Sequence, residues 1–299
     1  MEVLVPSAPK RLRVTQTMVE DFLVDPVLGA SVIFKEKMDA FQSSALRTAW
    51  WVPNVIDSSG FGTGKARRGF ILTNLRAVLI HGQWIWIYYQ TFGAGKQIYW
   101  PYYEFFNLWR SPIFAAQLGK LDAMGDEAGK DNTHGPECFI QHFRNGSRIV
   151  MPAPNWFQQA KGQAGLTFNM AYVDEWTKVE SMKPQSNMDG VGGIDQQVVG
   201  RLRRENFNQF HPLWMNRLYL SATMESPQHV SSKRVRVYQR EIAKGNPNYA
   251  ILSYSFKDFS NLPSHTGKPF KIQVPDWATL KRHKDMFTRA HRLREDFGI

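Results

Sequence analysis

The residues best suited to chemistry lie together in one short segment, residues 58–66, in which three glycines precede a lysine. Glycines at this spacing let the backbone turn tightly, so that successive N–H groups can converge on phosphate oxygens. A lysine at the end of such a loop reaches the β and γ phosphates of a nucleoside triphosphate. The residues that we expect to contact ATP are therefore Ser58, Ser59, Gly60, Phe61, Gly62, Thr63, Gly64, Lys65 and Ala66.

Two positions of this segment depart from the usual phosphate-loop pattern, G-x-x-x-x-G-K-[ST]. Ser59 replaces the first glycine, and Ala66 replaces the hydroxyl residue after the lysine. Because that hydroxyl normally binds Mg²⁺, the metal would depend on Asp174, water and the nucleotide. Weak metal binding, slow turnover, and a glycine-rich turn that binds no nucleotide all stay open as interpretations.

A pair of carboxylates, Asp174 and Glu175, follows the apolar run at 166–174. Ligands of open α/β sheets bind beyond the carboxyl ends of the strands, where this pair would lie. Asp174 would hold Mg²⁺ directly or through water, and Glu175 would polarise the water that attacks the γ phosphate. Solvated acids at a strand end are the simpler interpretation, but the upstream phosphate loop favours ATP hydrolysis.

Apolar strands and amphipathic helices alternate around these motifs. Runs of β-branched and aromatic residues predict strands at 50–57, 84–90, 166–174, 215–223 and 249–256, and Asn145-Gly146 predicts a hairpin at 137–152. Helical spacing predicts helices at 32–50, 66–82, 96–110, 194–207, 226–245 and 276–297. This alternation favours an α/β fold, with a mostly parallel central sheet flanked by helices.

The composition gives a first indication of a partner. The chain has 299 residues, enough for one large domain or two small ones, and a net charge of +11. A basic globule attracts polyanions such as nucleic acid, although a solvated or partner-binding basic surface has the same composition. The basic residues concentrated in the last third are Lys233, Arg234, Arg236, Arg240, Lys244, Lys281, Arg282, Lys284, Arg289, Arg292 and Arg294.

Other features exclude several classes of protein. No apolar run is long enough to predict a membrane-spanning helix or a secretory leader, so we expect no membrane. The single cysteine, Cys138, excludes an internal disulfide and a cysteine-based zinc site, and it fits a reducing compartment. We therefore expect the protein in cytoplasm.

The order of these motifs resembles the ATPase domain of the large terminase subunit, the DNA-packaging motor of tailed bacteriophages. The resemblance covers residues 32–260 and rests on MDAFQ (38–42), SGFGTGK (59–65), RNGSRI (144–149), GLTFNMAYVDEW (165–176) and LYLSAT (218–223). It implies a P-loop NTPase of the additional-strand, catalytic-glutamate type that uses ATP and Mg²⁺.

The resemblance also implies roles for further residues. Gln42 would contact adenine, and Ser221, Ala222 and Thr223 would couple the γ-phosphate state to movement. Motors of this family form rings in which an arginine of one subunit completes the neighbouring site. Candidates for that arginine are Arg148, Arg201, Arg203 and Arg204.

We accordingly predict an N-terminal arm (1–31) with one helical turn, an ATPase domain (32–260) and a basic C-terminal lid or linker (261–299). The expected partners are double-stranded DNA, a portal protein and a small terminase subunit, with a homo-oligomeric ring during packaging and a monomer as an alternative state in solution. The expected location is the host cytoplasm, transiently at the procapsid portal vertex. Two alternatives stay open: a superfamily 2 helicase-like DNA translocase, and a nucleotide-binding scaffold that does not hydrolyse ATP. No clustered acids indicate a nuclease domain in this chain.

Overall fold

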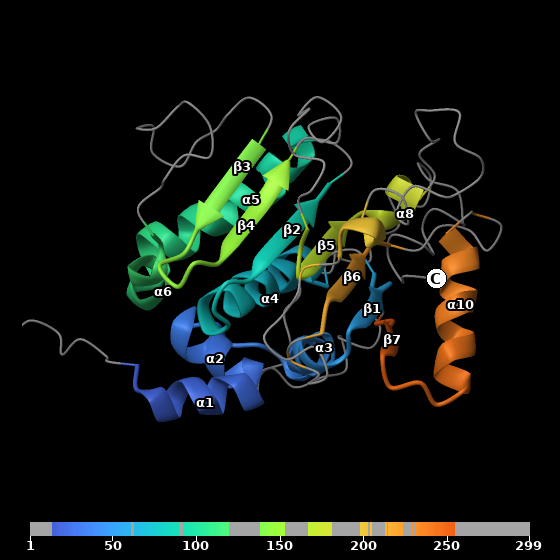
Figure 1. Cartoon of the computed structure of the whole chain (residues 1–299), viewed down its shortest axis with the longest axis horizontal. Helices are drawn as coiled ribbons and strands as arrows, with labels where there is room; N and C mark the ends of the chain where they lie inside the picture. Colours follow the sequence, from blue (N-terminus) through green and yellow to red (C-terminus); the bar gives the residue numbers. More distant parts are fainter. Residues whose placement is uncertain are drawn as a thin grey trace, which may run out of the picture.

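A seven-stranded sheet forms the centre of the computed structural model, with strand order β3-β4-β2-β5-β6-β1-β7 (Figure 1). The described residues are 14–60, 63–89, 92–119, 138–152, 167–180, 198–202, 204, 213, 215–223, 229 and 231–254. The strands are β1 (Asn54–Asp57), β2 (Trp84–Tyr88), β3 (Cys138–His142), β4 (Arg148–Pro152), β5 (Met170–Asp174), β6 (Arg217–Ser221) and β7 (Tyr249–Leu252). Every neighbouring pair is parallel except β3 and β4. The predicted α/β fold class is confirmed.

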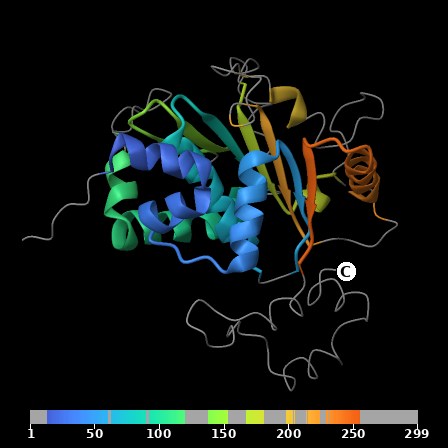
Figure 2. The same ribbon diagram turned by 90° about the horizontal axis from the view of Figure 1, so that it is seen from below.

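Helices pack on both faces of the sheet (Figure 2). One face carries α1 (Gln16–Val24), α2 (Pro26–Ile33), α3 (Ala40–Trp51), α4 (Lys65–Leu79), α5 (Phe92–Glu104), the π-helix η1 (Phe105–Arg110) and α6 (Pro112–Gln117). Residues of α8 (Trp176–Glu180) and α10 (Ser231–Ala243) pack on the other face, and a 3-10 turn, η2, spans Val199–Arg201. None of the described helices is long and apolar enough to cross a membrane.

The strands divide their side chains between two cores. In β2, Ile85 and Ile87 join the core under α1–α6, whereas Trp86 and Tyr88 join the core on the opposite face. This period of two is the consequence of the pleat. Because both faces are covered, the strands are apolar on both sides, as the dense apolar runs in the sequence predicted.

Most predicted elements are present, with shorter bounds. The five predicted strands contain β1, β2, β5, β6 and β7, and the Asn145-Gly146 hairpin joins β3 to β4. Gly146 has a φ of 82°, the left-handed conformation that such a turn requires. Helices α4 and α10 lie within or next to the predicted ranges 66–82 and 226–245. The helix predicted at 276–297 lies outside the described residues.

The N-terminal prediction was wrong in its local structure, because residues 16–33 form two helices. Thr15 caps α1 by accepting a hydrogen bond from the Met18 N–H at 3.3 Å, and Asp25 caps α2 ahead of Pro26. Phe22 and Ile33 are buried in the core, so these helices are part of it. Thr15, Asp25 and Pro26 are residue types typical of helix starts, and they indicate these two helices where the spacing of apolar residues does not.

Two helix predictions also need correction. The helix predicted at 32–50 is interrupted, because α2 ends at Ile33 and α3 begins after a capping box formed by Asp39 and Gln42. Among the described residues of the predicted helix at 194–207, residues 199–201 form the η2 turn, and residues 202 and 204 are not helical. The remaining residues of that range lie outside the described part of the chain.

Gly69 lets α4 approach the sheet, because a Cβ at this position would lie 2.3 Å from Cζ of the buried Tyr172. We expect Gly69→Ala to destabilise the fold by about 1–3 kcal/mol through overpacking. Gly93→Ala is the matched control, since its Cβ would meet nothing within 4 Å and α5 would gain helix propensity. Urea unfolding followed by circular dichroism measures both, and equal midpoints for the two variants would contradict the packing argument.

Candidate nucleotide-binding site

The segment predicted to be a phosphate loop, residues 58–66, joins β1 to the start of α4. It is called the phosphate loop below. Gly64 takes a φ of 79° and forms the N-cap of α4, and no side chain caps that helix. The first backbone N–H groups of α4 are therefore available to an anion, which the helix dipole also favours. Phe61 and Gly62 lie outside the described residues.

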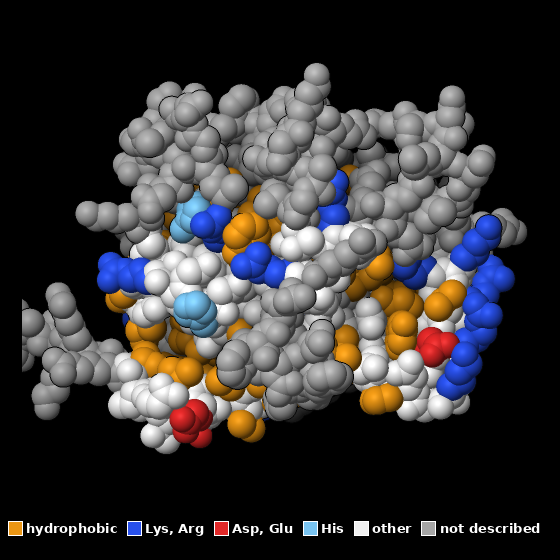
Figure 3. Space-filling model, in the orientation of Figure 1, with side chains coloured by type: hydrophobic (Ala, Val, Ile, Leu, Met, Phe, Trp, Pro, Cys, Tyr) orange, Lys and Arg blue, Asp and Glu red, His pale blue; other side chains and the backbone are white. Residues whose placement is uncertain are grey.

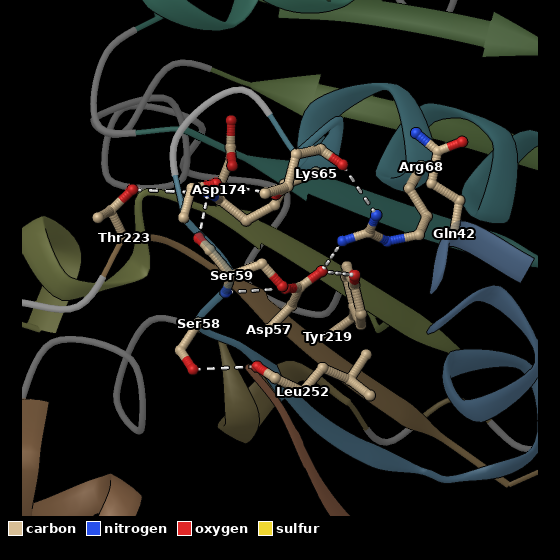
Figure 4. Close-up of polar contacts among 12 residues, drawn as sticks. Gln42, Asp57, Ser58, Ser59, Lys65, Arg68, Asp174, Tyr219, Thr223 and Leu252 are labelled. Atoms are coloured by element: carbon tan, nitrogen blue, oxygen red, sulfur yellow. Dashed lines mark hydrogen bonds and ion pairs between the residues drawn. The ribbon is translucent and has the colours of Figure 1, made fainter. Parts of the chain in front are cut away.

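Lys65, the first residue of α4, is turned toward its own loop (Figure 4). Its Nζ donates to the carbonyl oxygens of Ser59 at 2.6 Å and Gly60 at 2.9 Å, and lies 3.5 Å from Oγ1 of Thr223. Burial lowers the pKa of this ammonium, and three carboxylates oppose that shift: Asp57, Asp174 and Glu175. A phosphate entering the loop would offer the buried ammonium stronger acceptors than these carbonyls.

Asp174 lies at the carboxyl end of β5, in register with Ser221 at the end of β6. Its side chain is buried, and its Oδ1 accepts a hydrogen bond from the Tyr172 hydroxyl at 3.2 Å. Burial, followed by the charge of Glu175, raises the pKa of Asp174 to about 6. A buried carboxylate that is costly to ionise is a suitable ligand for Mg²⁺, because the cation would stabilise its charge.

The rest of a magnesium site would come from the substrate. The described residues contain no group of three or more His, Cys, Asp or Glu side chains placed to hold a metal. Mg²⁺ commonly binds through one or two carboxylates plus substrate phosphates and water, so a single carboxylate is compatible with it.

Glu175 follows β5 in an unusual conformation, with a φ of 49°. Few residues other than glycine adopt this left-handed region, and such strained positions cluster at functional sites. The side chain is 39% exposed, and its carboxylate pairs with Nζ of Lys178 at 3.2 Å. Glu175 directly follows the last residue of β5, and its charge acts on the neighbouring Asp174 carboxylate.

Gln42 reaches the phosphate loop from α3. Its Nε2 lies 2.9 Å from the position that a Cβ on Gly64 would take. The same side chain completes the capping box of α3, where Oε1 accepts from the Asp39 N–H at 3.4 Å. Gln42 therefore connects the start of α3 to the start of α4, beside the loop that would hold the phosphates.

Sequence reasoning missed a buried charge network under the loop (Figure 4). Asp57 Oδ1 accepts from Ser59 Oγ at 2.6 Å, and its Oδ2 accepts from the Tyr219 hydroxyl at 2.6 Å and from Arg68. Tyr219 stacks on Tyr172, with ring centroids 5.6 Å apart. The signal was an aspartate ending an apolar strand and an arginine on the face of a helix that is otherwise apolar.

The third predicted motif joins the same edge. Ser221, Ala222 and Thr223 are all buried, and Ala222 N–H donates to the Asp57 carbonyl oxygen at 3.1 Å. Because β6 lies between β1 and β5, its end lies between the phosphate loop and the acidic pair. The structure thus brings Lys65, Asp174 and Thr223 together from distant parts of the sequence.

The similarity of this chain to known proteins lies in its fold. The sequence matches no protein-family model, and a search of curated proteins finds no match. Among solved structures, the large terminase of a thermophilic bacteriophage aligns with 88% of this chain at a TM-score of 0.54 and 12% identity. A second crystal form of that terminase, in complex with ATP-gamma-S, aligns equally well. The chain has the large-terminase fold. It spans 54% of the length of the phage terminase chain in the first of these structures.

The candidate arginines lie at the opposite edge of this terminase fold. Arg148 begins β4, and Arg148 and Arg204 lie over the ring of Trp84, the first residue of β2, at 4.8 and 4.1 Å. Parallel strands begin at the edge opposite the phosphate loop, so neither arginine can reach the site of its own chain. Arg201 ends the η2 turn, whose backbone pairs with Phe168 just before β5. Arg203 lies outside the described residues.

Restoring the missing hydroxyl should strengthen metal binding at this loop. We expect Ala66→Ser to lower the Mg²⁺ concentration for half-maximal ATP binding on the order of tenfold, by adding an oxygen ligand at the start of α4. Titration of Mg²⁺ with a fluorescent ATP analogue measures the shift. Ala116→Ser, at an exposed position of α6, is the control and should leave the titration unchanged.

Proposed function

We propose that this chain is the ATP-hydrolysing part of a terminase-type motor that moves double-stranded DNA into a procapsid. The observation that carries the proposal is the convergence of Lys65, Asp174, Glu175 and Thr223 beside an uncapped helix N-terminus at the carboxyl edge of the sheet. The fold shared with the phage terminase supports the same conclusion.

Each of these residues has a role in the proposed hydrolysis. Lys65 and the N–H groups of α4 bind and orient the phosphates, and Asp174 holds Mg²⁺, which would neutralise phosphate charge when bound. Glu175 accepts a proton from the attacking water. Thr223, 3.5 Å from Nζ of Lys65, is placed to respond when that ammonium moves between the loop carbonyls and a phosphate.

The proposed function also requires partner molecules. We infer a homo-oligomeric ring, in which an arginine from the opposite edge of a neighbouring subunit completes the site, with Arg148, Arg201 and Arg204 as the described candidates. We also infer contact with a portal protein and a small terminase subunit in the host cytoplasm, at the portal vertex.

A nucleotide-binding scaffold is the second candidate, because Ala66 removes a ligand that Mg²⁺ usually has. Phosphate release from ATP by the purified protein distinguishes the two. We expect Mg²⁺-dependent release that Lys65→Ala abolishes, whereas Lys37→Ala, at an exposed position outside the site, leaves it unchanged. Tight ATP binding without phosphate release would contradict the motor and favour the scaffold. ATP-dependent uptake of DNA into procapsids then tests translocation itself.

A further inference from the structure

One face of α10 carries a row of cations. Lys233, Arg236 and Arg240 of α10 are exposed, and so is Lys244, which follows the helix and whose N–H still donates to the Arg240 carbonyl oxygen at 3.1 Å. Blue side chains follow the length of this helix at the right of Figure 3. At 100° per residue these four positions fall within about 80° of the helix circumference. They extend over about 16 Å, because each residue adds about 1.5 Å along the axis. The row is therefore one continuous basic stripe rather than charges scattered around the helix.

Few acids of the described residues lie beside the stripe. Glu241 is the only acid on α10, and it pairs with Lys244 at 2.7 Å while also accepting from Asn246 at 3.0 Å. Among the described residues, Lys233, Arg236 and Arg240 have no carboxylate within ion-pair distance. Uncompensated cations on one surface repel one another, so a polyanion lying along the stripe would be favoured.

Strand β7 lies between α10 and the phosphate loop and contacts both. The ring of the buried Tyr238 packs edge-on against Tyr249 of β7, with centroids 5.0 Å apart. At the other end of that strand, the Leu252 carbonyl oxygen accepts from Ser58 N–H at 2.8 Å. Just beyond the strand, the Tyr254 carbonyl oxygen accepts from Gly60 N–H at 2.8 Å. A displacement of α10 would thus be transmitted to the backbone of the phosphate loop through one strand.

We propose that the basic stripe of α10 binds the phosphate backbone of double-stranded DNA, and that β7 connects this contact to the phosphate loop so that bound DNA changes the rate of ATP hydrolysis. The claim that the stripe binds DNA depends on the charge and geometry of α10. The claim that bound DNA changes the rate of hydrolysis rests on the proposed ATPase function. DNA is the polyanion that we choose because a straight row of cations matches the repeating phosphates of its backbone. The row contains no aromatic side chain that would stack on bases, and contacts to phosphates are independent of base sequence.

The test compares two triple variants of equal charge in the full chain. Lys233→Gln/Arg236→Gln/Arg240→Gln removes the stripe, and Lys35→Gln/Lys37→Gln/Arg144→Gln removes three exposed cations elsewhere. Binding to a fluorescent random-sequence duplex is measured over a range of salt concentrations. The stripe variant should bind at least tenfold more weakly, and the slope of log K against log[salt] should shrink by about 3, one unit for each lost phosphate contact. The control variant should keep the wild-type slope.

Several results would overturn the proposal. One is an unchanged affinity and slope in the stripe variant; another is an equal loss in the control. Loss of binding to vesicles containing phosphatidylserine, with DNA binding unchanged, would assign the stripe to a membrane surface instead. The single variant Arg240→Gln, with an expected slope change of about 1, keeps the test decisive if the triple variant unfolds.

ATP turnover separates this inference from the proposed function. The stripe variant should keep the wild-type rate of phosphate release without DNA but lose the change in rate that DNA causes. If DNA changes the rate of phosphate release equally in the stripe variant and in the wild type, the connection through β7 is overturned. Absence of phosphate release in every protein, together with loss of DNA binding in the stripe variant, would refute the ATPase and leave the DNA surface standing.

Discussion

Replacing Arg68 by Gln is expected to destabilise the fold by about 3–5 kcal/mol, because it leaves the Asp57 carboxylate buried without its cation. The two side chains are 1% and 0% exposed, so water cannot take over the role of the guanidinium. Ser59 and Tyr219 still donate hydrogen bonds to the carboxylate, but neither carries a compensating charge. The free energy of unfolding, from urea titration followed by circular dichroism, measures the loss.

The matched control breaks an arginine–aspartate pair at the surface. Arg47 and Asp25 lie 2.7 Å apart, with side chains 50% and 37% exposed. Exposed pairs contribute about 0–1 kcal/mol, so Arg47→Gln should cost no more than that. If the two variants lose the same stability, burial of the Asp57–Arg68 pair is not what stabilises the fold.

The same pair predicts how stability depends on pH. Burial would raise the pKa of Asp57, but Arg68 and the hydrogen bonds from Ser59 and Tyr219 hold it below the ordinary value of 3.8. The stabilisation is therefore present above pH 3.8 and is lost as the pH falls through the lowered pKa. In Arg68→Gln the buried carboxyl is expected to bind a proton more readily. As the pH is lowered from about 7 to about 4, the variant should therefore regain stability, and the difference in unfolding free energy between it and the wild type should become smaller.

The sequence predicted the parts of the fold that depend on local pattern. The glycines and Lys65 predicted the loop between β1 and α4, and Asn145-Gly146 predicted the β3–β4 hairpin, because both depend on a few adjacent residues. Long-range pairing was beyond such reasoning. Nothing local in β6 indicates that it lies between β1 and β5, yet that position brings Thr223 close to Lys65.

The buried polar residues were the least predictable part of the site. Arg68 and Asp57 are residue types that usually lie at the solvated surface. Only the tertiary packing of this fold buries them together. Arg148 and Arg204 are candidates for an arginine that acts on a neighbouring subunit, and the sequence did not indicate where in the fold they lie. The direction of the strands places both at the edge opposite the phosphate loop. Strand direction and register, not residue type, decide which charged groups can reach the phosphate loop.

Replacing Glu175 by Gln should reduce ATP turnover on the order of 10²–10⁴-fold, because an amide cannot accept the proton of the attacking water. The affinity for ATP should change little, since the substitution preserves shape and leaves Lys65 and Asp174 in place. Steady-state phosphate release gives the turnover, and equilibrium titration with a fluorescent ATP analogue gives the affinity. A loss of affinity that matches the loss of turnover would contradict a role as general base.

In an alternative interpretation, Glu175 only stabilises the following helix, α8, through its ion pair with Lys178. Lys178→Gln removes the 3.2 Å ion pair while leaving the carboxylate intact, and Glu20→Gln removes an exposed carboxylate on α1. If Glu175 acts on water, both controls should keep turnover within a few-fold of wild type. A loss in Lys178→Gln as large as in Glu175→Gln would mean that the ion pair, not the carboxylate, is required. Because Glu175 holds a φ of 49°, which glycine adopts without cost, Glu175→Gly should retain the fold while losing turnover, and that separates conformational strain from chemistry.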